Sequence, residues 1–418
     1  MEAAEAAAAA GAEEEDWDEG EGDGEEEQEE QEQEEEEEEA QAGSSSGASS
    51  DGESSSAGGA TGDAADVAAA MAAGGSGGAA AGGDGTSAQA SAAAAEEVHP
   101  VISMPLSGLE EALRGCSTLA CLQQAHMRSK HPQQFNFPHF LLLGFPKCAT
   151  TSLYRHLIQH PTIMAPKYKE PHFFTRFCRQ GAGGCQPEEE ASYINETLHL
   201  GIALQARLFM ASFEASTHYS LEGEWLAPKL ARDLPWLKLV LSLREPISRW
   251  ISMLKHNLDN GRVPACYKLS AGAAYPCIRR KLEQREQGYA PRLRAWATAF
   301  PPEQLYVLQY ENLTSEGVTR KALRDIKRFV GVDPNLPNND LGLYNSRRSE
   351  TEGWPMTRKE YARLVELARR DAQEVVELVR QHGWADADRW LEAWEEAWAA
   401  NLEACRPGPR GACSIQLT

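Results

Sequence analysis

The chain has 418 residues and a formal net charge of −23 at pH 7, which by itself would suggest a protein that repels anions. Residues 1–98 hold 29 of the 63 acidic side chains and no Lys or Arg, so we expect a disordered acidic tail over residues 1–100. The remaining 320 residues carry 34 acidic and 40 basic side chains, so anionic ligands are not excluded. The tail would act as a solvated spacer or as an internal competitor for a basic cleft.

The first informative element is a short apolar run, Phe140–Leu143, which predicts a buried strand. Gly144 and Pro146 end this strand, and the hydroxyl residues 150–152 can then open a helix. The start of a helix leaves backbone N–H groups without partners, and together with the helix dipole they attract phosphate or sulfate oxygens. Lys147 adds a positive charge at the same place.

The spacing of this loop argues against an ordinary nucleoside triphosphatase or kinase. A Walker A loop has Lys directly before the hydroxyl residue, whereas Lys147 precedes Thr150 by three positions and no second Gly is present. The order Pro-Lys-x-x-Thr-Thr at the end of a strand resembles instead the 5′-phosphosulfate loop of sulfotransferases. A P-loop-type kinase remains an alternative.

The segment Lys169-Glu-Pro-His-Phe-Phe174 follows the expected helix and supplies two candidate bases. Glu170 is the first candidate, because Phe173 and Phe174 could raise its pKa toward neutrality. His172 is the competing base and would share a face with Glu170 if the segment were extended. The simpler interpretation is a surface loop in which Glu170 pairs with a neighbouring Lys.

A second apolar run, residues 208–213, predicts a strand that leads into Glu214-Ala-Ser-Thr217. This sequence allows two interpretations. The carboxylate and the two hydroxyls could orient a sugar hydroxyl, or they could cap the amphipathic stretch that begins near Glu222 and Trp225.

A third strand, residues 237–243, runs into Arg244-Glu-Pro-Ile-Ser-Arg-Trp-Ile-Ser252, where Pro suits the first turn of a helix. Arg244 and Ser252 could both reach one phosphate group, with Arg249 as a spare cation. This segment resembles the 3′-phosphate motif of sulfotransferases. A solvated strand end with an Arg244–Glu245 ion pair is the alternative.

Together, these motifs resemble the carbohydrate sulfotransferases, most closely the N-acetylgalactosamine 4-sulfate 6-O-sulfotransferase type, over about residues 137–350. The resemblance implies a P-loop-like sulfotransferase fold and the donor 3′-phosphoadenosine-5′-phosphosulfate. One departure is Ala149, where the family usually has Gly, a residue that permits positive φ and close approach to phosphate. A catalytically inactive glycan-binding protein is therefore a further alternative.

The resemblance also implies a role for each candidate residue. Glu170 would be the general base, and Lys147 would stabilise the leaving group. Arg347 or Arg348 would close over the donor from a basic loop, which could equally be an exposed loop or a docking point for an anionic glycan. The implied donor site comprises Lys147, Cys148, Ala149, Thr150, Thr151, Ser152, Arg244, Ser252 and Arg347. A glycan acceptor is expected, and neither a metal cofactor nor a nucleic-acid partner; the acceptor's identity and the oligomeric state stay open.

Helical patterns alternate with the strands, which predicts an α/β domain with a central parallel sheet flanked by helices. We expect a transferase core over residues 131–350 and a helical C-terminal part of the same domain over 351–405. Three Trp residues there, spaced by four, should pack on one helix face. The helical patterns lie at about residues 246–258, 288–299, 316–330, 357–382 and 386–403.

Eight of the nine cysteines form close neighbours, which makes short-loop disulfides plausible. The sequons Asn195-Glu-Thr197 and Asn312-Leu-Thr314 also favour an oxidising lumen, as in the Golgi or the secretory route. The absence of an apolar span or signal in the sequence leaves a cytoplasmic location as the alternative. The expected pairs are Cys116 with Cys121, Cys178 with Cys185, Cys266 with Cys277, and Cys405 with Cys413.

Overall fold

A computed structural model describes most of the chain beyond the acidic tail. The expected tail over residues 1–100 lies outside the described residues. Among the residues that are described, no helix combines the length and the apolarity needed to cross a membrane. The structure describes residues 108–128, 135–178, 185–270, 272–313, 316–339, 341–342, 354–385, 387–405 and 412–417.

Five parallel strands form the central sheet in the order β2-β3-β1-β4-β5. Strand β1 lies between β3 and β4. Strands β2 and β3 lie on one side of β1, and β4 and β5 lie on the other, so the strand order reverses at β1. The strands are β1 (Phe140–Gly144), β2 (Ile163–Met164), β3 (Ala211–Glu214), β4 (Lys238–Leu243) and β5 (Leu305–Gln309). A separate antiparallel pair joins β6 (Trp354–Thr357) to β7 (Ala412–Ile415).

The helices follow the strands in alternation, as the sequence predicts for an α/β domain. They are α3 (Gly108–Leu113), α4 (Leu119–Arg128), α5 (Thr150–Ile158), α6 (Phe173–Phe177), α7 (Pro187–Ser192), α8 (Leu200–Gln205), α9 (Gly223–Asp233), α10 (Pro246–Asp259), α11 (Ala265–Leu269), α12 (Tyr275–Glu283), α13 (Tyr289–Ala299), α14 (Glu316–Val330), α15 (Arg358–His382) and α16 (Ala387–Ala404). Short 3-10 turns lie at Thr217–Leu221, Arg285–Gln287, Pro302–Gln304 and Tyr310–Leu313, and a π-turn at Tyr193–Thr197.

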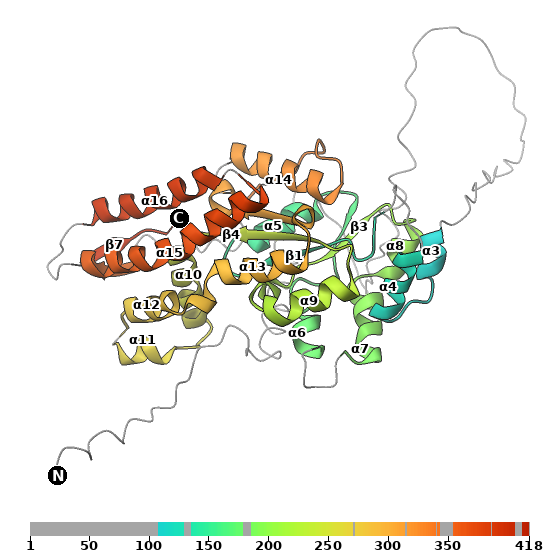
Figure 1. Ribbon diagram of the computed structural model, residues 1–418, viewed down its shortest axis with the longest axis horizontal. Coiled ribbons are helices and arrows are strands. Elements are labelled where there is room, and N and C mark those ends of the chain that lie inside the picture. Colours follow the sequence, from blue (N-terminus) through green and yellow to red (C-terminus); the bar gives the residue numbers. More distant parts are fainter. Residues whose placement is uncertain are drawn as a thin grey trace, which may run out of the picture. The chain divides into compact units, whose positions relative to one another are not determined.

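Successive side chains of a strand point to opposite faces of the sheet, and a buried apolar cluster covers each face. In β1, Phe140 and Leu142 join one buried cluster, to which α5 and α14 contribute. Leu141 and Leu143 join the other cluster, to which α9, α10 and α13 contribute. Figure 1 shows α14 on one side of the strands and α9 and α13 on the other. This arrangement confirms the predicted parallel sheet between helical layers.

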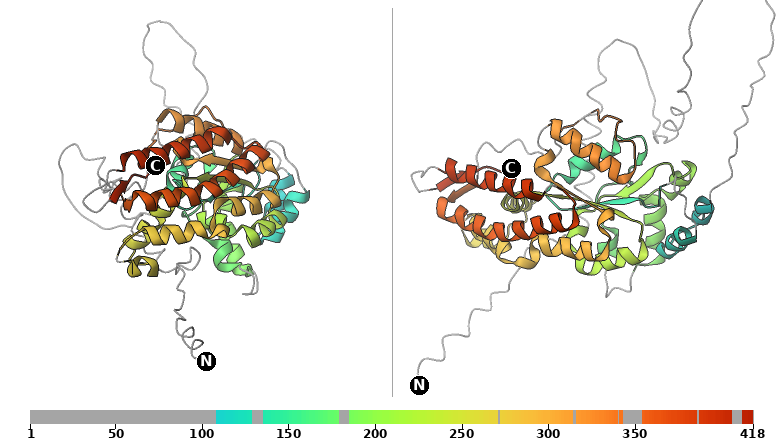
Figure 2. Two further views of the ribbon diagram at one scale, coloured as in Figure 1. Left: turned by 60° about the vertical axis from the view of Figure 1, so that its left-hand side comes forward. Right: turned by 45° about the horizontal axis from the view of Figure 1, so that its top comes forward.

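The C-terminal helices α15 and α16 run side by side, as both views of Figure 2 show. Trp390, Trp394 and Trp398 of α16 are all buried, so the predicted packing role of these residues is confirmed. The indole N–H of Trp398 donates to the carboxylate of Glu245 at 2.6 Å. The same carboxylate caps the N-terminus of α10, so α16 supports the helix that follows β4.

Three of the expected disulfides are present, each closing a short loop. They join Cys116 to Cys121, Cys178 to Cys185, and Cys266 to Cys277. Cys405 is also disulfide-bonded. Cys148 is a free thiol and is buried.

Candidate active site

The polar segments that follow β1, β3 and β4 meet at one edge of the sheet, since these strands are parallel and neighbours. The backbone N–H of Phe145, just after β1, donates to the carbonyl of Ser242 in β4 at 3.0 Å. A Cβ atom on Gly144 would lie 2.4 Å from Oγ of Ser220 and 2.5 Å from the carbonyl oxygen of Thr217. Only glycine therefore lets the segment after β3 approach the end of β1.

The loop between β1 and α5 has the left-handed conformations that anion-binding loops commonly use. Lys147 has a φ of 65° and Ala149 a φ of 58°. Ala149 occupies the N-cap position of α5 and makes no side-chain cap bond, so this loop leads directly into the helix start that the sequence predicts. The positive φ of Ala149 is a conformation that Gly adopts more readily than Ala.

Cys148 faces inward from this loop. Its side chain is fully buried, and Sγ lies 3.4 Å from the hydroxyl oxygen of Tyr289. Burial raises the pKa of the thiol, although the nearby Arg249 opposes this shift. Cys148 can therefore face a ligand only through its backbone.

Tyr289 links this loop to the end of β4, because its hydroxyl oxygen also accepts the backbone N–H of Arg244 at 3.3 Å. The guanidinium of Arg244 is 4.5 Å from the ring centre of Tyr310. Ser252 lies two helical turns further along, on α10, and is half-buried. Arg347 and Arg348 lie outside the described residues.

Arg249 is not a spare cation, as the sequence suggested, but a buried support for the loop. Its side chain is 1% exposed, and Nε donates to the carbonyl of Pro146 at 3.4 Å. The guanidinium also lies 4.4 Å from the ring of Trp250 and 5.2 Å from that of Tyr289. The buried guanidinium of Arg249 thus fixes the backbone at Pro146, next to Lys147.

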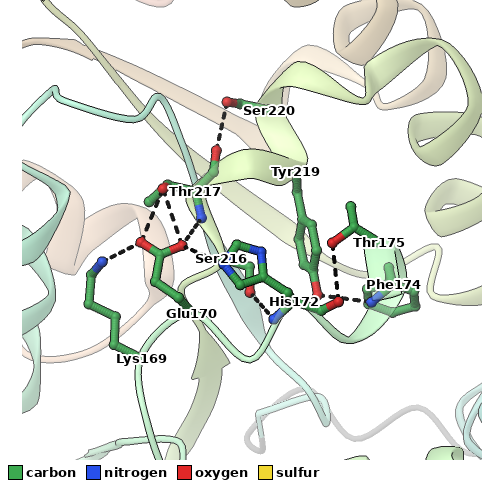
Figure 3. A network of polar contacts seen from close by, with 9 residues as sticks. All are labelled: Lys169, Glu170, His172, Phe174, Thr175, Ser216, Thr217, Tyr219 and Ser220. Atoms are coloured by element: carbon green, nitrogen blue, oxygen red, sulfur yellow. Dashed lines mark hydrogen bonds and ion pairs between the residues drawn. The ribbon is translucent and has the colours of Figure 1, made fainter. Parts of the chain in front are cut away.

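Glu170 lies beside the segment that follows β3 (Figure 3). Its Oε2 accepts the backbone N–H of Thr217 at 2.8 Å, and its Oε1 accepts the hydroxyl of Thr217 at 3.0 Å. Lys169 forms an ion pair with the same carboxylate, so the pairing with a neighbouring Lys is present. The side chain of Glu170 keeps 21% of its surface exposed.

The expected rise in the pKa of Glu170 is wrong. Burial does raise it, but the positive charge of Lys169, followed by those of His172 and His218, outweighs burial and lowers the pKa to about 2. Phe173 packs against Tyr193, and Phe174 packs against Tyr219.

His172 meets Glu170 although the segment is not extended. Both residues have positive φ, and Nε2 of His172 lies 3.6 Å from Oε2 of Glu170. The backbone N–H of His172 donates to Oγ of Ser216 at 2.8 Å, which ties the two segments together (Figure 3). Burial lowers the pKa of His172 to about 4, so the imidazole is neutral at pH 7.

Glu214 does not face the site, so its expected role in orienting a sugar hydroxyl is wrong. The side chain has no exposed surface and accepts the phenol of Tyr193 at 2.6 Å. Burial raises its pKa to about 7. The capping alternative fails as well, because neither Ser216 nor Glu222 makes a side-chain cap bond to the helix it precedes. Of this sequence, Thr217 is the residue that contacts Glu170.

Sequence reasoning missed His218, Tyr219 and Tyr193. His218 belongs to a group with Glu170 and His172 in which one ligand atom of each side chain lies within 4.8 Å of the others. The hydroxyl oxygen of Tyr219 accepts the backbone N–H of Phe174 at 3.0 Å. His218 directly follows the Glu214–Thr217 sequence, and this adjacency was the one available indication.

The fold and the site define an α/β protein with an anion-binding type of loop at the point where the strand order of a parallel sheet reverses. The chain belongs to the sulfotransferase family, since the family model described as "Sulfotransferase domain" matches residues 137–363. The sequence-based resemblance to sulfotransferases is thereby confirmed at the level of the family.

Several curated proteins are similar to this chain. Human bifunctional heparan sulfate N-deacetylase/N-sulfotransferase 3 is 28% identical over 243 residues, covering 53% of this chain and 25% of that protein. Carbohydrate sulfotransferase 15 from Rattus norvegicus is 26% identical over 298 residues, covering 56% of this chain and 52% of that protein. The chain thus spans between a quarter and about half the length of these relatives.

Solved structures of low sequence identity are also similar. A sulfotransferase from Alicyclobacillus acidocaldarius matches with a TM-score of 0.41 and 22% identity, covering 60% of this chain and 98% of that one. The sulfotransferase domain of the Synechococcus PCC 7002 olefin synthase matches with a TM-score of 0.34 and 17% identity, covering 58% and 98%.

Proposed function

We propose that the protein transfers a sulfonate group from 3′-phosphoadenosine-5′-phosphosulfate to a hydroxyl of a glycan. The observation that carries this proposal is the meeting of the segments after β1, β3 and β4 at one sheet edge, in a chain whose family is that of the sulfotransferases. The link through Tyr289 supports a single donor site, because it fixes the loop of Lys147 against the strand end of Arg244.

In this proposal the donor lies along the loop and the start of α10. Lys147 would neutralise the bridging oxygen that leaves the sulfonate, while Arg244 and Ser252 would hold the 3′-phosphate, with Arg347 closing over it. The phosphosulfate would be bound by the backbone of Cys148 and Ala149 and by Thr150, Thr151 and Ser152.

Glu170 would take the proton of the acceptor hydroxyl while the oxygen of that hydroxyl forms a bond to the sulfur of the donor. The bond from sulfur to the bridging oxygen then breaks, which releases adenosine 3′,5′-bisphosphate and a sulfated glycan. Glu170 is more exposed than His172, with 21% against 8% of the side-chain surface, which supports it as the base. His172 is the alternative base, since it is neutral at pH 7 and lies 3.6 Å from Glu170.

A galactosamine-containing glycosaminoglycan is the acceptor we propose, and 6-O transfer to 4-sulfated N-acetylgalactosamine is the first reaction to assay. The resemblance of the sequence motifs is the basis for this choice. Similarity to carbohydrate sulfotransferase 15 supports a carbohydrate acceptor in general, and similarity to the heparan sulfate N-deacetylase/N-sulfotransferases supports heparan-type acceptors as the comparison arm. We propose that the work is done in the Golgi or secretory lumen, which the disulfides support.

We also propose that residues 131–350 form the transferase core and that residues 351–405 are a helical part of the same domain. The bond from Trp398 to Glu245 supports the assignment of both parts to one domain, because it joins them through the cap of α10.

Donor binding is tested by titrating the full chain with adenosine 3′,5′-bisphosphate and, separately, with ATP and Mg²⁺. We expect the bisphosphate to bind and Lys147→Ala to weaken that binding. Lys321→Ala, on the outer face of α14 with its side chain 73% exposed, is the matched control. Preference for ATP with Mg²⁺ would instead support the kinase alternative.

Catalysis is tested by sulfonate transfer from labelled donor to chondroitin, dermatan and heparan acceptors. We expect Glu170→Gln to lose transfer while still binding the bisphosphate, with the exposed Glu366→Gln on α15 as control. A glycan-binding protein without catalysis is the second candidate, and the positive φ of Ala149 favours it, since Ala is strained there. Glycan binding without transfer to any acceptor would support that candidate.

A further inference from the structure

Three side chains at the candidate active site form a group that the proposed reaction does not require. Glu170, His172 and His218 each offer one ligand atom, and these atoms lie within 4.8 Å of one another. Figure 3 shows the imidazole of His172 beside the carboxylate of Glu170. The rings of His172 and His218 have their centres 5.3 Å apart, so both imidazoles approach the same carboxylate from neighbouring segments.

Two imidazoles and one carboxylate are a common ligand set for Zn²⁺. Zn–N and Zn–O bonds of about 2.0–2.2 Å place the ligand atoms of a tetrahedral site roughly 3.3–3.6 Å apart. The separation of 3.6 Å between Nε2 of His172 and Oε2 of Glu170 already meets that requirement. The three ligand atoms lie within 4.8 Å of one another, and binding of the ion would have to shorten the longer separations.

His218 supplies a second, independent indication. Its Nδ1 is buried and, among the described residues, has no hydrogen-bond partner. A buried polar atom without a partner costs free energy, and a bound cation or a water would remove that cost.

The surroundings also fit a metal carboxylate ligand. The backbone N–H of Thr217 holds Oε2 of Glu170 at 2.8 Å, and a hydrogen bond of this kind orients metal-binding carboxylates. Lys169 pairs with the same carboxylate, so a cation has to compete with a positive side chain. The carboxylate of Glu170 can therefore bind the metal ion or form the ion pair with Lys169, but not both at once.

We propose that Glu170, His172 and His218 bind Zn²⁺ or a similar divalent transition-metal ion, with at least one coordination position open to solvent. The ion occupies the lone pairs of Glu170, so its binding prevents this carboxylate from accepting a proton. The binding itself stands independently of the proposed function. The inhibitory consequence rests on that function, because it assumes Glu170 as the base.

The binding is tested on the full chain after removal of metals by a chelator. Co²⁺ serves as the spectroscopic probe, because a site with two imidazoles and a carboxylate gives a visible absorption that aqueous Co²⁺ lacks, and Zn²⁺ should abolish it by displacement. Calorimetric titration with Zn²⁺ should give one equivalent at this site. Loss of a residue that hydrogen-bonds to a metal ligand typically weakens metal binding about 10- to 100-fold. Loss of one of the three ligands themselves should weaken Zn²⁺ binding by at least that much.

The variants are His218→Ala, His172→Ala and Glu170→Gln, with His218→Gln as a milder change, and circular dichroism checks that each one folds. His382→Gln, at the end of α15, is the matched control and should bind Zn²⁺ as the natural chain does. Equal affinity for Zn²⁺ in the control and in all the ligand variants, or no Co²⁺ absorption in the natural chain, overturns the proposal.

A second measurement separates this proposal from the function. Zn²⁺ should inhibit sulfonate transfer by the natural chain, and chelation should restore it, whereas His218→Ala should resist inhibition relative to its own metal-free rate. If Zn²⁺ binds with the expected variant pattern but no acceptor is sulfated, the metal site stands and the proposed function fails. If transfer proceeds and the ligand variants bind Zn²⁺ like the control, the metal site fails alone.

Discussion

The hydroxyl oxygen of Tyr289 lies 3.4 Å from Sγ of Cys148 and accepts the backbone N–H of Arg244 at 3.3 Å. One phenol thus connects the loop after β1 with the end of β4, and it is buried. In the proposed function these are the two segments that bind opposite ends of the donor. Their separation is therefore set from within the core and not by the ligand.

Tyr289→Phe tests that connection, because it keeps the ring and removes the bridging oxygen. We expect about fivefold weaker binding of adenosine 3′,5′-bisphosphate and a loss of roughly 1 kcal/mol in the free energy of unfolding. Calorimetric titration and urea unfolding measure the two effects. Tyr306→Phe on β5 is the control, and equal donor affinity in both variants would show that the bridge has no part in binding.

Ala149→Gly should stabilise the loop. A non-glycine residue in the left-handed region costs about 1–2 kcal/mol, whereas the extra freedom of Gly in the unfolded chain costs about 0.4–1 kcal/mol. With a φ of 58° at Ala149, we expect a net gain of about 0.5–1 kcal/mol in unfolding free energy. Ala399→Gly, on the exposed side of α16, should lose about 1 kcal/mol. A loss in both variants would contradict the strain at residue 149.

The ion pair with Lys169 predicts how transfer depends on pH. With the pKa of Glu170 lowered to about 2, its carboxylate stays ionised above pH 4, so kcat/KM should show no decline from this group between pH 8 and pH 5. Lys169→Met removes the first of the charges that lower this pKa, and the acid limb should move up by roughly 1–3 units. Lys167→Met, whose side chain is 55% exposed, is the control. Superimposable profiles for all three proteins would remove Lys169 from the explanation.

Glu214 predicts a pH dependence of stability. Its folded pKa of about 7 lies above the usual value of 4.5, so the stability from this group is fully present below pH 4.5 and is lost as the pH rises to about 7. The loss is at most about 3 kcal/mol. Glu214→Gln does not titrate, so its unfolding free energy relative to the natural chain should rise over that interval. Urea unfolding at pH 5 and pH 8 measures this, and the exposed Glu188→Gln should show no such trend.

Much of the fold was predictable, because long amphipathic and apolar patterns carry it. The predicted helices at 246–258, 316–330 and 357–382 agree with α10, α14 and α15 to within a residue at each end. The two-residue strand β2 and the pair β6 and β7 were missed. Segments of two to four residues have too little periodicity to be recognised.

The sequence indicates candidate residues for the site more readily than their pKa values and burial. Lys147 and Arg244 follow strands that the sequence predicts, and parallel neighbours bring such strand ends together, whereas Glu170 follows the missed strand β2. The low pKa of Glu170 and the burial of Glu214 depend on side chains from other segments, and sequence distance does not reveal these contacts. His218 and Tyr193 were missed for the same reason.

The carboxylate of Glu245 caps α10 and also accepts the indole N–H of Trp398, a residue 35 positions beyond the end of the family match at 363. The match ends inside α15, a helix whose apolar residues belong to the hydrophobic core, so its end does not mark a physical border of the molecule. Helix α16 lies outside the family match but contacts the residue that caps the helix after Arg244. A substitution in α16 can therefore change the position of the Arg244 motif.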